Sequence, residues 1–464
     1  MRLDNIFKKN IKNIFPTKIS VTSIILIILI ILLFYYRENI YVNYMTFFIV
    51  VRGIIAPNCF WWRMSELLLK DRSGVNLYNK IKVKSDGFYK INMFGTDIYL
   101  VTEIKYIKTI LDNSPFLFGV GKLKNDMFRS FMKKNVGVSM GCPWKRRRKL
   151  NEQVLDTDQF HRYSNMYNTI IKNEVKRQKN YTNFDEFVKS AKIITIKIVF
   201  NDDKVTEEVF QMFSEANSIK TFFNKDFKVK SKISDKYISY IKDNINNPRD
   251  NSLVKLCTLY EKDKEEILYQ IPHFIFPIGA IFNSNVPRLL LLLCNHPNIF
   301  KKLINEIKTT LNESGDESSK IYKMKYLRKC VLELLRLNNP VVSTFRTLLH
   351  NFQFDKKYTF SKGTQFLILN NPVLREKEFF DNPNKFIPER WTDEMEKSYY
   401  SISFNHGPQR CPGKELSIYL IQSFTVNLLI HYNVLDNIEN IRARKIDTKN
   451  IPQMINPCNI TFSY

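Results

Sequence analysis

The chain has few glycines and lacks any segment that would divide it into several domains. Only 13 of its 464 residues are glycine, and no glycine- or serine-rich linker follows the N-terminal region. No internal repeat is present either, which argues against a solenoid or a propeller. We therefore expect an N-terminal tail and membrane segment over residues 1–40 and one large domain over residues 41–464.

The cysteines lack the spacing of a disulfide framework or of a zinc site. There are seven, an odd number, and they are scattered at positions 59, 142, 257, 294, 330, 411 and 458. A reducing compartment fits this pattern best. Hydrophobic residues make up 44% of the chain and charged residues 25%, which is enough for a large core and argues against disorder.

Acidic residues are outnumbered by basic ones, 45 to 71, which gives a formal net charge of +26. A basic surface favours an anionic membrane or an acidic protein partner such as a redox protein. A general bias toward lysine is an equally good explanation, and both stay open. No clustered nucleic-acid motif appears, so we expect no nucleic-acid partner.

One long run without charged residues lies near the N-terminus. Residues 19–36 are rich in isoleucine and leucine and bordered by Lys18 and Arg37, and their length approaches the roughly 20 residues that span a bilayer. They predict a single-pass membrane anchor of helical form, with a buried helix as the alternative. No small-residue cleavage site follows. The basic residues before the run favour a cytosolic N-terminus, and a second apolar stretch at 41–51 would then return the chain.

The most informative segment is the loop at residues 404–413, FNHGPQRCPG, which precedes an apolar, helix-like run. Cys411 lies where the loop meets the helix. Backbone N–H groups and the positive N-terminal end of the helix favour a thiolate at this place. Gly407 and Gly413 permit close approach of a flat macrocycle, and Phe404 can pack on its cysteine side. An ordinary buried cysteine is the alternative for a cysteine taken alone.

Two segments upstream pair acidic and basic residues in apolar surroundings. Glu333 and Arg336 are three residues apart within the apolar stretch 326–337 and share a helix face. A solvated ion pair is the alternative, although the apolar neighbours argue against full exposure. Arg390 follows in the segment FIPERW, residues 386–391.

A further helix is predicted to begin near Pro143, and it carries a tryptophan and a basic run. Trp144 and Arg148 are four residues apart, so they share a face and can both reach one carboxylate. Because residues 145–149 are all cationic, a patch for nucleic acid or anionic lipid is the competing interpretation. Arg346 stands ten positions after Arg336, and a surface arginine is its alternative.

These segments, in this order, resemble the cytochrome P450 family. The loop is similar to the family's cysteine-ligand signature, Phe-x-x-Gly-x-(Arg or His)-x-Cys-x-Gly, except that Gln409 occupies the basic position. The resemblance covers about residues 78–464 and implies a mainly helical fold with small sheets. It also implies haem b as the cofactor, with Cys411 as the axial thiolate and metal ligand.

The same resemblance implies roles for the other residues. Trp144, Arg148 and Arg346 would bind haem propionates, and Phe404, Gly407 and Gly413 would belong to the haem-binding loop. Three residues, Glu333, Arg336 and Arg390, would form a buried structural triad.

The hydrophobic patterns predict where the small sheets and the helices lie. Strands are expected at 88–94, 97–100, 352–354, 358–360 and 365–369. Helices are expected at 144–155, 184–200, 286–311, 325–337 and 415–429. Residues 201–265 carry no recognisable motif.

The resemblance is weakest in the helix expected over the distal haem face. Family monooxygenases carry an acid and a threonine there to deliver protons, whereas residues 276–287 read FPIGAIFNSNVP and contain no acid. The usual alcohol position falls on Ile281 or Phe282, and a deletion of one turn would bring in Asn283, Ser284 or Asn285. A polar interruption between two prolines explains these residues equally well.

The resemblance implies an oxidoreductase, a membrane-anchored monooxygenase that inserts one oxygen of dioxygen into an apolar, lipid or sterol substrate. Electrons would come from NADPH through a separate reductase, and the catalytic domain would lie in the cytosol, which conflicts with the orientation favoured by the N-terminal charges. A peroxide-using isomerase, dehydratase or peroxygenase is the alternative, and so is a haem-binding relative without catalysis. A membrane-tethered basic protein without haem would require the ordered motifs to be accidental.

Overall fold

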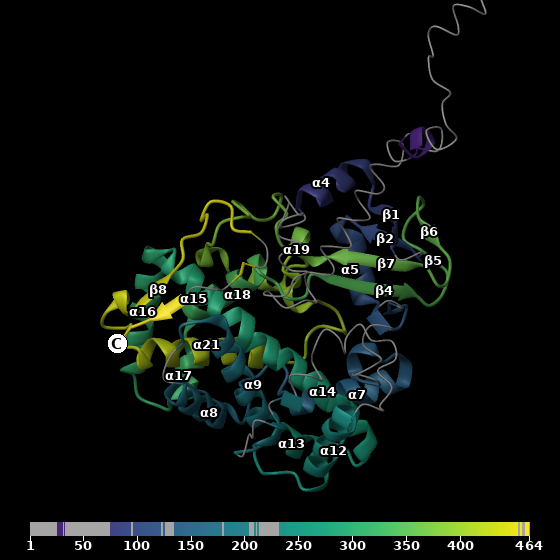
Figure 1. The fold of residues 1–464 in the computed structure, drawn as a ribbon. Coiled ribbons are helices and arrows are strands. Elements are labelled where there is room, and N and C mark those ends of the chain that lie inside the picture. The colour runs from purple at the N-terminus through teal and green to yellow at the C-terminus, as the bar shows by residue number, and fades with distance from the viewer. Residues whose placement is uncertain are drawn as a thin grey trace, which may run out of the picture.

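The computed structural model describes most of the chain from residue 75 onward. The described residues are 26–30, 32, 75–93, 96–121, 124–125, 134–178, 181–203, 208–209, 211–212, 232–452, 455–456 and 460–463. Helices dominate them; the strands labelled β1, β2, β4, β5, β6 and β7 lie at one side of the molecule, and β8 lies at the opposite side (Figure 1). This confirms the predicted mainly helical fold with small sheets.

The helices before the long central helix are α4 (Val75–Lys84), α5 (Ile104–Asp112), α7 (Gly141–Val154), α8 (Ser164–Arg177), α9 (Phe184–Phe200), α12 (Lys232–Asn246) and α13 (Leu253–Tyr260). Those after it are α16 (Pro297–Leu311), α17 (Glu317–Lys323), α18 (Lys325–Leu337), α19 (Asn370–Val373), α20 (Asp393–Lys397) and α21 (Lys414–His431). Short 3-10 turns are η1 (Val136–Val138), η3 (Pro388–Arg390), η4 (Ile402–Phe404) and η5 (Ile438–Asn440).

The main sheet has five strands in the order β1-β2-β7-β4-β3. They are β1 (Phe88–Met93), β2 (Thr96–Val101), β7 (Gln365–Leu369), β4 (Ser343–Leu348) and β3 (Phe118–Val120). β2 and β7 run parallel, whereas the other neighbours are antiparallel. Two small antiparallel pairs complete the described strands: β5 (Phe352–Gln353) with β6 (Thr359–Phe360), and β8 (Ile441–Ala443) with β9 (Ile460–Phe462).

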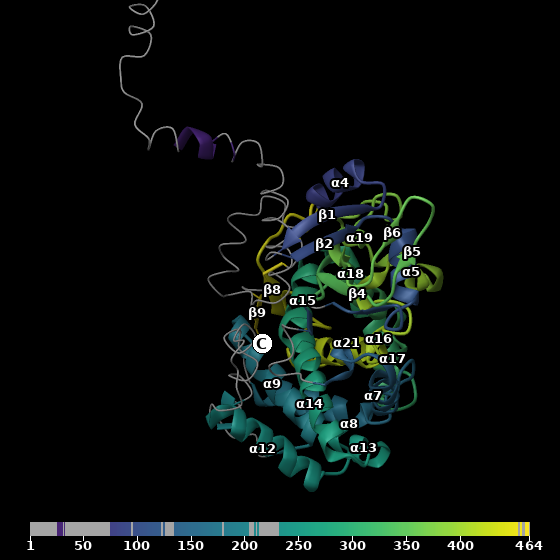
Figure 2. The same ribbon diagram turned by 90° about the vertical axis from the view of Figure 1, so that its right-hand side faces the viewer.

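One long helical column runs through the molecule (Figure 2). It consists of α14 (Lys264–Ala280), a π-helical turn η2 (Ile281–Asn285) and α15 (Val286–Cys294). Pro287 has no N–H to bond the preceding turn, and its ring would clash with a regular α-helical carbonyl four residues earlier. The π turn lies directly before this proline, as expected for a helix that must accommodate it.

The helical core is assembled from faces of α8, α9, α15 and α21. Phe424 of α21 is fully buried and meets Phe282 of the π turn edge-to-face at 5.6 Å between ring centroids. Asn168 of α8 accepts hydrogen bonds from Ser423 and Asn427 of α21, at 2.7 and 2.9 Å. These polar contacts lie inside the apolar core and fix how α21, which follows the cysteine loop, packs on α8.

Two predicted helices have the bounds found in the structure, α9 and α18. The predicted helix over 286–311 was wrong in its continuity, because α15 ends at Cys294 and α16 begins at Pro297. A proline at the first turn of α16 suits a new helix start better than a continued helix.

The predicted membrane anchor falls largely outside the described residues. Within residues 19–36 the structure describes only 26–30 and 32, which are helical, with side chains about half exposed. Among all the described residues, no helix combines the length and the apolar character needed to cross a bilayer.

Candidate functional site

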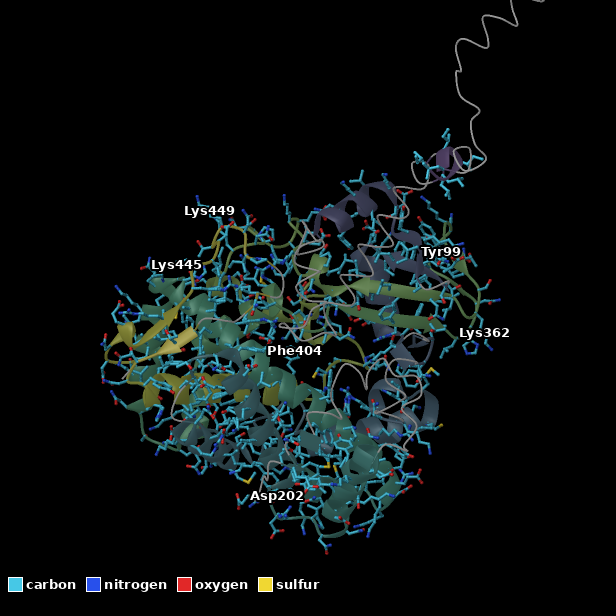
Figure 3. All side chains as sticks on the ribbon, in the orientation of Figure 1. Tyr99, Asp202, Lys362, Phe404, Lys445 and Lys449 are labelled. Atoms are coloured by element: carbon cyan, nitrogen blue, oxygen red, sulfur yellow. The ribbon has the colours of Figure 1, made fainter. Side chains whose placement is uncertain are left out.

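Cys411 lies in a closed loop between η4 and α21. Its backbone N–H donates to the carbonyl of Phe404 at 2.8 Å, and the N–H of Arg410 donates to the carbonyl of Gly407 at 3.1 Å. Gly413 immediately precedes α21, and its carbonyl accepts from Ser417 N–H at 2.8 Å. The loop therefore holds the cysteine at the start of a helix. Phe404, where the loop begins, lies near the middle of the view in Figure 3.

The two predicted loop glycines have different structural reasons. Gly407 has φ of +69°, and a Cβ there would lie 2.2 Å from the carbonyl oxygen of Leu111 at the end of α5. Any side chain would thus separate the loop from α5. A Cβ on Gly413 would meet only Leu155, at an ordinary 3.5 Å, so the protein itself leaves space beside this residue.

Opposing effects act on the thiol of Cys411. Burial raises its pKa, while the N–H of Gly413 and the positive charges of Arg148, Lys414 and Arg410 act in the opposite direction. Burial prevails, so the thiol alone is protonated at neutral pH. A bound metal ion would reverse this balance, because coordination stabilises the thiolate.

The loop is tied to the segment between α7 and α8 on its outer side. Arg410 makes a bidentate ion pair with Asp158, at 2.7 and 2.6 Å. Thr157 Oγ1 donates to the carbonyl of Pro412 at 2.8 Å. These bonds act on the two residues that flank Cys411, and so they restrict the position of its sulfur.

Helix α7 brings Trp144 and Arg148 to the same side as the loop. Arg148 donates from Nη1 to the carbonyl of Arg410 at 2.5 Å and from Nε to Glu152 at 2.7 Å. Trp144 is buried edge-to-face against Phe116, with ring centroids 5.5 Å apart. Its indole N–H has no hydrogen-bond partner among the described residues, which leaves one donor available to a ligand.

The basic run after Trp144 is largely paired within the protein. Arg146 binds Glu261 through two bonds of 2.7 and 2.6 Å. Arg147 binds Glu266 through two bonds of 2.6 Å. With Arg148 held as described, three of the five cations do not form a free basic patch, which weakens the alternative of a nucleic-acid or lipid surface.

Arg346 lies on β4 and is almost wholly buried. Its Nε donates to Ser114 Oγ at 2.9 Å and its Nη1 to the carbonyl of Phe345 at 2.8 Å. It forms no ion pair with a carboxylate of the described residues. Burial lowers its pKa to about 10, so it stays charged at neutral pH. A buried guanidinium without a counter-charge is costly unless an anion binds it.

Glu333, Arg336 and Arg390 meet in a buried cluster. Glu333 is completely buried and accepts from Arg336 Nε and Nη2 at 2.9 and 2.8 Å and from Arg390 Nε at 3.1 Å. Trp391 Nε1 and the backbone N–H of Ile387 also donate to it, both at 3.0 Å. Burial alone would raise the pKa of Glu333, but Arg336 and Arg390 outweigh it and hold the pKa below its usual range.

The distal candidates lie in the π turn and at its end. Ser284 and Asn285 are buried, and Asn285 Oδ1 has no hydrogen-bond partner among the described residues. Asn283 belongs to the same turn, but its side chain is outside the described part of the structure. No carboxylate stands in the segment from Phe276 to Pro287, so two asparagines and a serine are its polar side chains.

Sequence reasoning missed two residues near this region, Lys124 and His273. His273 lies on α14, and burial together with the positive charges of Lys124 and Arg148 lowers its pKa to about 4. Burial and the charge of Arg346 lower the pKa of Lys124 to about 8. Neither residue stands in a recognisable motif, so only the fold reveals that they are close to Arg148 and Arg346.

The C-terminal part of the chain is similar to known proteins. Residues 284–459 match the model of the family described as cytochrome P450. Human aromatase is 28% identical over 177 residues, which are 36% of this chain and 35% of that protein. Cytochrome P450 9e2 of Blattella germanica is 30% identical over 187 residues, 39% of this chain and 35% of that protein.

A plant enzyme is similar over a comparable length. Beta-amyrin 16-beta-monooxygenase of Platycodon grandiflorus is 26% identical over 155 residues, 32% of each chain. The matched part of this chain thus spans about a third of the length of these curated relatives. The family match at residues 284–459 includes Glu333, Arg336, Arg346, Arg390 and Cys411, whereas Trp144 and Arg148 lie before it.

Proposed function

We propose that this chain, whose residues 284–459 match the cytochrome P450 family model, is a haem-thiolate monooxygenase that inserts one oxygen atom of dioxygen into an apolar, lipid or sterol substrate. The observation that carries the proposal is the Cys411 loop, whose backbone is closed on itself and positioned at the start of α21. One relative is itself named a monooxygenase, which supports the same reaction class.

The residues of the site fit haem b. Cys411 supplies the sulfur, and the space beside Gly413 would accept a ring that packs closely against the backbone. The bound cofactor would supply an iron that activates dioxygen, and a thiolate ligand favours cleavage of the O–O bond. Phe404, whose carbonyl receives the Cys411 N–H, would lie on the same side of the ring as the sulfur.

Three residues would hold the propionates of the haem. Arg346 is buried without a carboxylate partner in the described structure, and the indole N–H of Trp144 lacks an acceptor. Arg148 already donates to the carbonyl of Arg410 and to Glu152, and these bonds hold the loop. Its positive charge would also attract a propionate. Glu333, with its two arginines, serves the scaffold and takes no part in the chemistry.

The remaining partners follow from the proposed chemistry. Electrons would come from NADPH through a separate reductase, and the basic surface of the protein suits an acidic partner. Residues 19–36 would anchor the chain in a membrane, a proposal supported by the exposed aliphatic side chains at 26–30 and 32. The catalytic domain would then lie on the cytosolic face.

A second function is favoured by the π turn. It offers serine and asparagine side chains and no carboxyl group to pass protons toward dioxygen. A haem-thiolate enzyme that uses peroxides, as an isomerase, dehydratase or peroxygenase, would not need such a group. A haem-binding relative without catalysis is compatible with the same segment.

The test is the carbon monoxide difference spectrum of the reduced, haem-loaded protein. We expect the red-shifted Soret band of a thiolate ligand, its loss in Cys411→Ser, and its retention in Cys142→Ser, a control at an exposed cysteine. A wild-type spectrum without that band would refute the proposal. Turnover with NADPH and reductase, compared with turnover on peroxides alone, then distinguishes the monooxygenase from the peroxide-using enzyme.

A further inference from the structure

An open pocket of about 570 Å³ lies where α4, the start of α5 and the segment after α19 meet. Helix α4 lies beside α19 in both ribbon views (Figures 1 and 2). Lys82 and Val83 come from α4, Glu103 directly precedes α5, and Glu376 and Glu378 follow α19. None of these residues takes part in the proposed haem site, so the pocket requires its own explanation.

Glu376 is 8% exposed in this pocket and uses only one of its two carboxylate oxygens. Oε2 accepts from Lys82 Nζ at 3.1 Å, whereas Oε1 has no hydrogen-bond partner among the described residues. A buried acceptor that is left without a donor costs about 1–3 kcal/mol, and more when it is charged. A donor on a ligand in the pocket would remove that cost.

The carboxylates around Glu376 outnumber the ammonium group that pairs with them. Lys82 Nζ also lies 3.5 Å from Glu378, so one lysine serves two carboxylates. Glu103 makes no capping bond to α5 and no ion pair within the described part of the chain. Burial raises the pKa of Glu376, and together with the charges of Glu378 and Glu103 it outweighs the opposite effect of Lys82. A second cation is therefore favoured at this place.

The other charged residues of the pocket do not offset this negative charge. Asp86 pairs with Lys357, and Lys105 lies 3.9 Å from Asp355, so both have partners that do not line the pocket. Lys377 is exposed to solvent. The three glutamates of the pocket thus exceed its two remaining lysines by one charge.

The chemistry of the pocket favours an organic ammonium group over a metal ion. Within the described structure, no three or more histidine, cysteine or acidic side chains are arranged to hold a metal. A primary ammonium carries three N–H donors and requires no fixed coordination geometry. Val83 lines the pocket and is 89% exposed, so it offers an apolar contact to the carbon atoms next to such a group.

We propose that this pocket binds a primary ammonium group, which donates to Oε1 of Glu376 and is attracted by Glu378 and Glu103. The ammonium has two sources, a free aliphatic amine or the ethanolamine headgroup of a phospholipid. Both present the same N–H donors beside carbon atoms, so the experiment has one arm for each source. The inference goes beyond the haem-thiolate function and does not depend on it.

The experiment compares full-length wild type with Glu376→Gln, Glu103→Gln and the control Glu313→Gln. Glu313 is exposed and does not line the pocket, so its replacement removes the same charge elsewhere. One arm measures the binding of butylammonium and of 1-butanol by calorimetry. The other arm measures binding to phosphatidylcholine vesicles with and without phosphatidylethanolamine. The protein is reduced and saturated with carbon monoxide, so that an amine cannot bind to a haem iron.

If the source is a free amine, wild type should bind butylammonium about tenfold more tightly than butanol, and phosphatidylethanolamine should not change vesicle binding. If the source is a lipid headgroup, phosphatidylethanolamine should strengthen vesicle binding about tenfold. In either case Glu376→Gln should remove the preference. Glu103→Gln should reduce it by a smaller factor, because this side chain is half-buried. Glu313→Gln should behave as wild type.

The proposal is overturned if wild type shows neither preference, or if folded Glu376→Gln matches wild type with all four probes. An equal loss in Glu313→Gln also overturns it. If Glu376→Gln does not fold, Glu103→Gln decides, because the Glu103 side chain makes no capping bond that the fold requires. Unchanged preferences in that variant then overturn the proposal. None of these outcomes bears on the haem-thiolate function, which the carbon monoxide difference spectrum tests separately.

Discussion

Replacement of Glu333 by glutamine removes a single negative charge from a fully buried cluster. The carboxylate accepts five hydrogen bonds, two from Arg336 and one each from Arg390, Trp391 and Ile387. An amide of the same shape keeps one acceptor oxygen and turns an NH2 group toward the remaining donors. Two guanidinium groups then stay inside the protein without their counter-charge.

The expected cost follows from that loss. Removal of one partner from a buried ion pair destabilises a protein by about 3–5 kcal/mol, because the other charge remains desolvated. Total stabilities are roughly 5–15 kcal/mol, so Glu333→Gln should consume a large fraction of the whole. Arg390 also bonds the carbonyl of Asp381 at 2.8 Å, and the segment it holds leads toward the cysteine loop. Haem retention should therefore fall together with stability.

The assay is urea unfolding of the haem-loaded protein, followed in parallel by the Soret band and by far-ultraviolet circular dichroism. The matched control is Glu389→Gln, one residue from Arg390. Glu389 is 44% exposed and pairs with Lys302, so its replacement should cost less than about 1 kcal/mol. Equal unfolding midpoints and equal haem retention for the two variants would show that the buried cluster does not support the fold as argued.

Three further predictions concern the surroundings of the cysteine. Burial lowers the pKa of His161 from 6.5 to about 4, so the unfolded chain binds a proton at this residue at a higher pH than the folded protein does. About 3 kcal/mol of stability should therefore be lost as the pH falls from 6.5 to 4. In a pH series of unfolding midpoints, His161→Gln should reduce the change over that range. Gly407→Ala should prevent the loop from packing on α5. Gly413→Ala adds only an ordinary contact at 3.5 Å, so it should leave the far-ultraviolet spectrum unchanged and weaken haem binding alone. Similar behaviour of the two variants would contradict the different roles assigned to the two glycines. Asp158→Asn should loosen the loop at Arg410, because it removes the charge that pairs with this arginine. The thiolate Soret band should then convert to its blue-shifted form faster than in wild type. The rate of this conversion should depend less on salt concentration in the variant than in wild type.

How much the sequence predicts depends on the length and regularity of each element. In helices α9 and α18 the apolar residues recur with helical periodicity along the whole segment, and the predicted bounds agree with the structure. Strand β4 was not predicted, because residues 343–348 read STFRTL and carry an arginine at their centre. That arginine lies buried in the strand and bonds Ser114 and the carbonyl of Phe345, and such contacts cannot be read from periodicity.

The candidate site shows the same division. The cysteine loop and the Glu333 cluster are visible in the sequence because several residues with fixed spacing act together. The fifth donor to Glu333, from the Trp391 indole, and the meeting of Lys124 with His273 depend on contacts between distant segments. Lys124 and His273 have no pattern around them, and nothing in the FIPERW segment indicates that the Trp391 indole reaches Glu333, so only the folded chain reveals these contacts.

The long central helix finally links local backbone chemistry to the choice between the two proposed reactions. Prolines at 272, 277 and 287 each remove an N–H from the helix, and the π turn at Ile281–Asn285 lies between the last two. Turns of this kind leave backbone acceptors and side chains such as Asn285 Oδ1 without their usual donors. An acceptor can position a water or a bound hydroxyl group, but an amide at neutral pH cannot supply the protons that dioxygen requires. If the protein reduces dioxygen, its protons must therefore travel through ordered water or through the substrate, whereas a peroxide brings its own. Solvent isotope effects on NADPH-driven and peroxide-driven turnover would distinguish these routes, because only the first requires protons to reach dioxygen through ordered water or through the substrate.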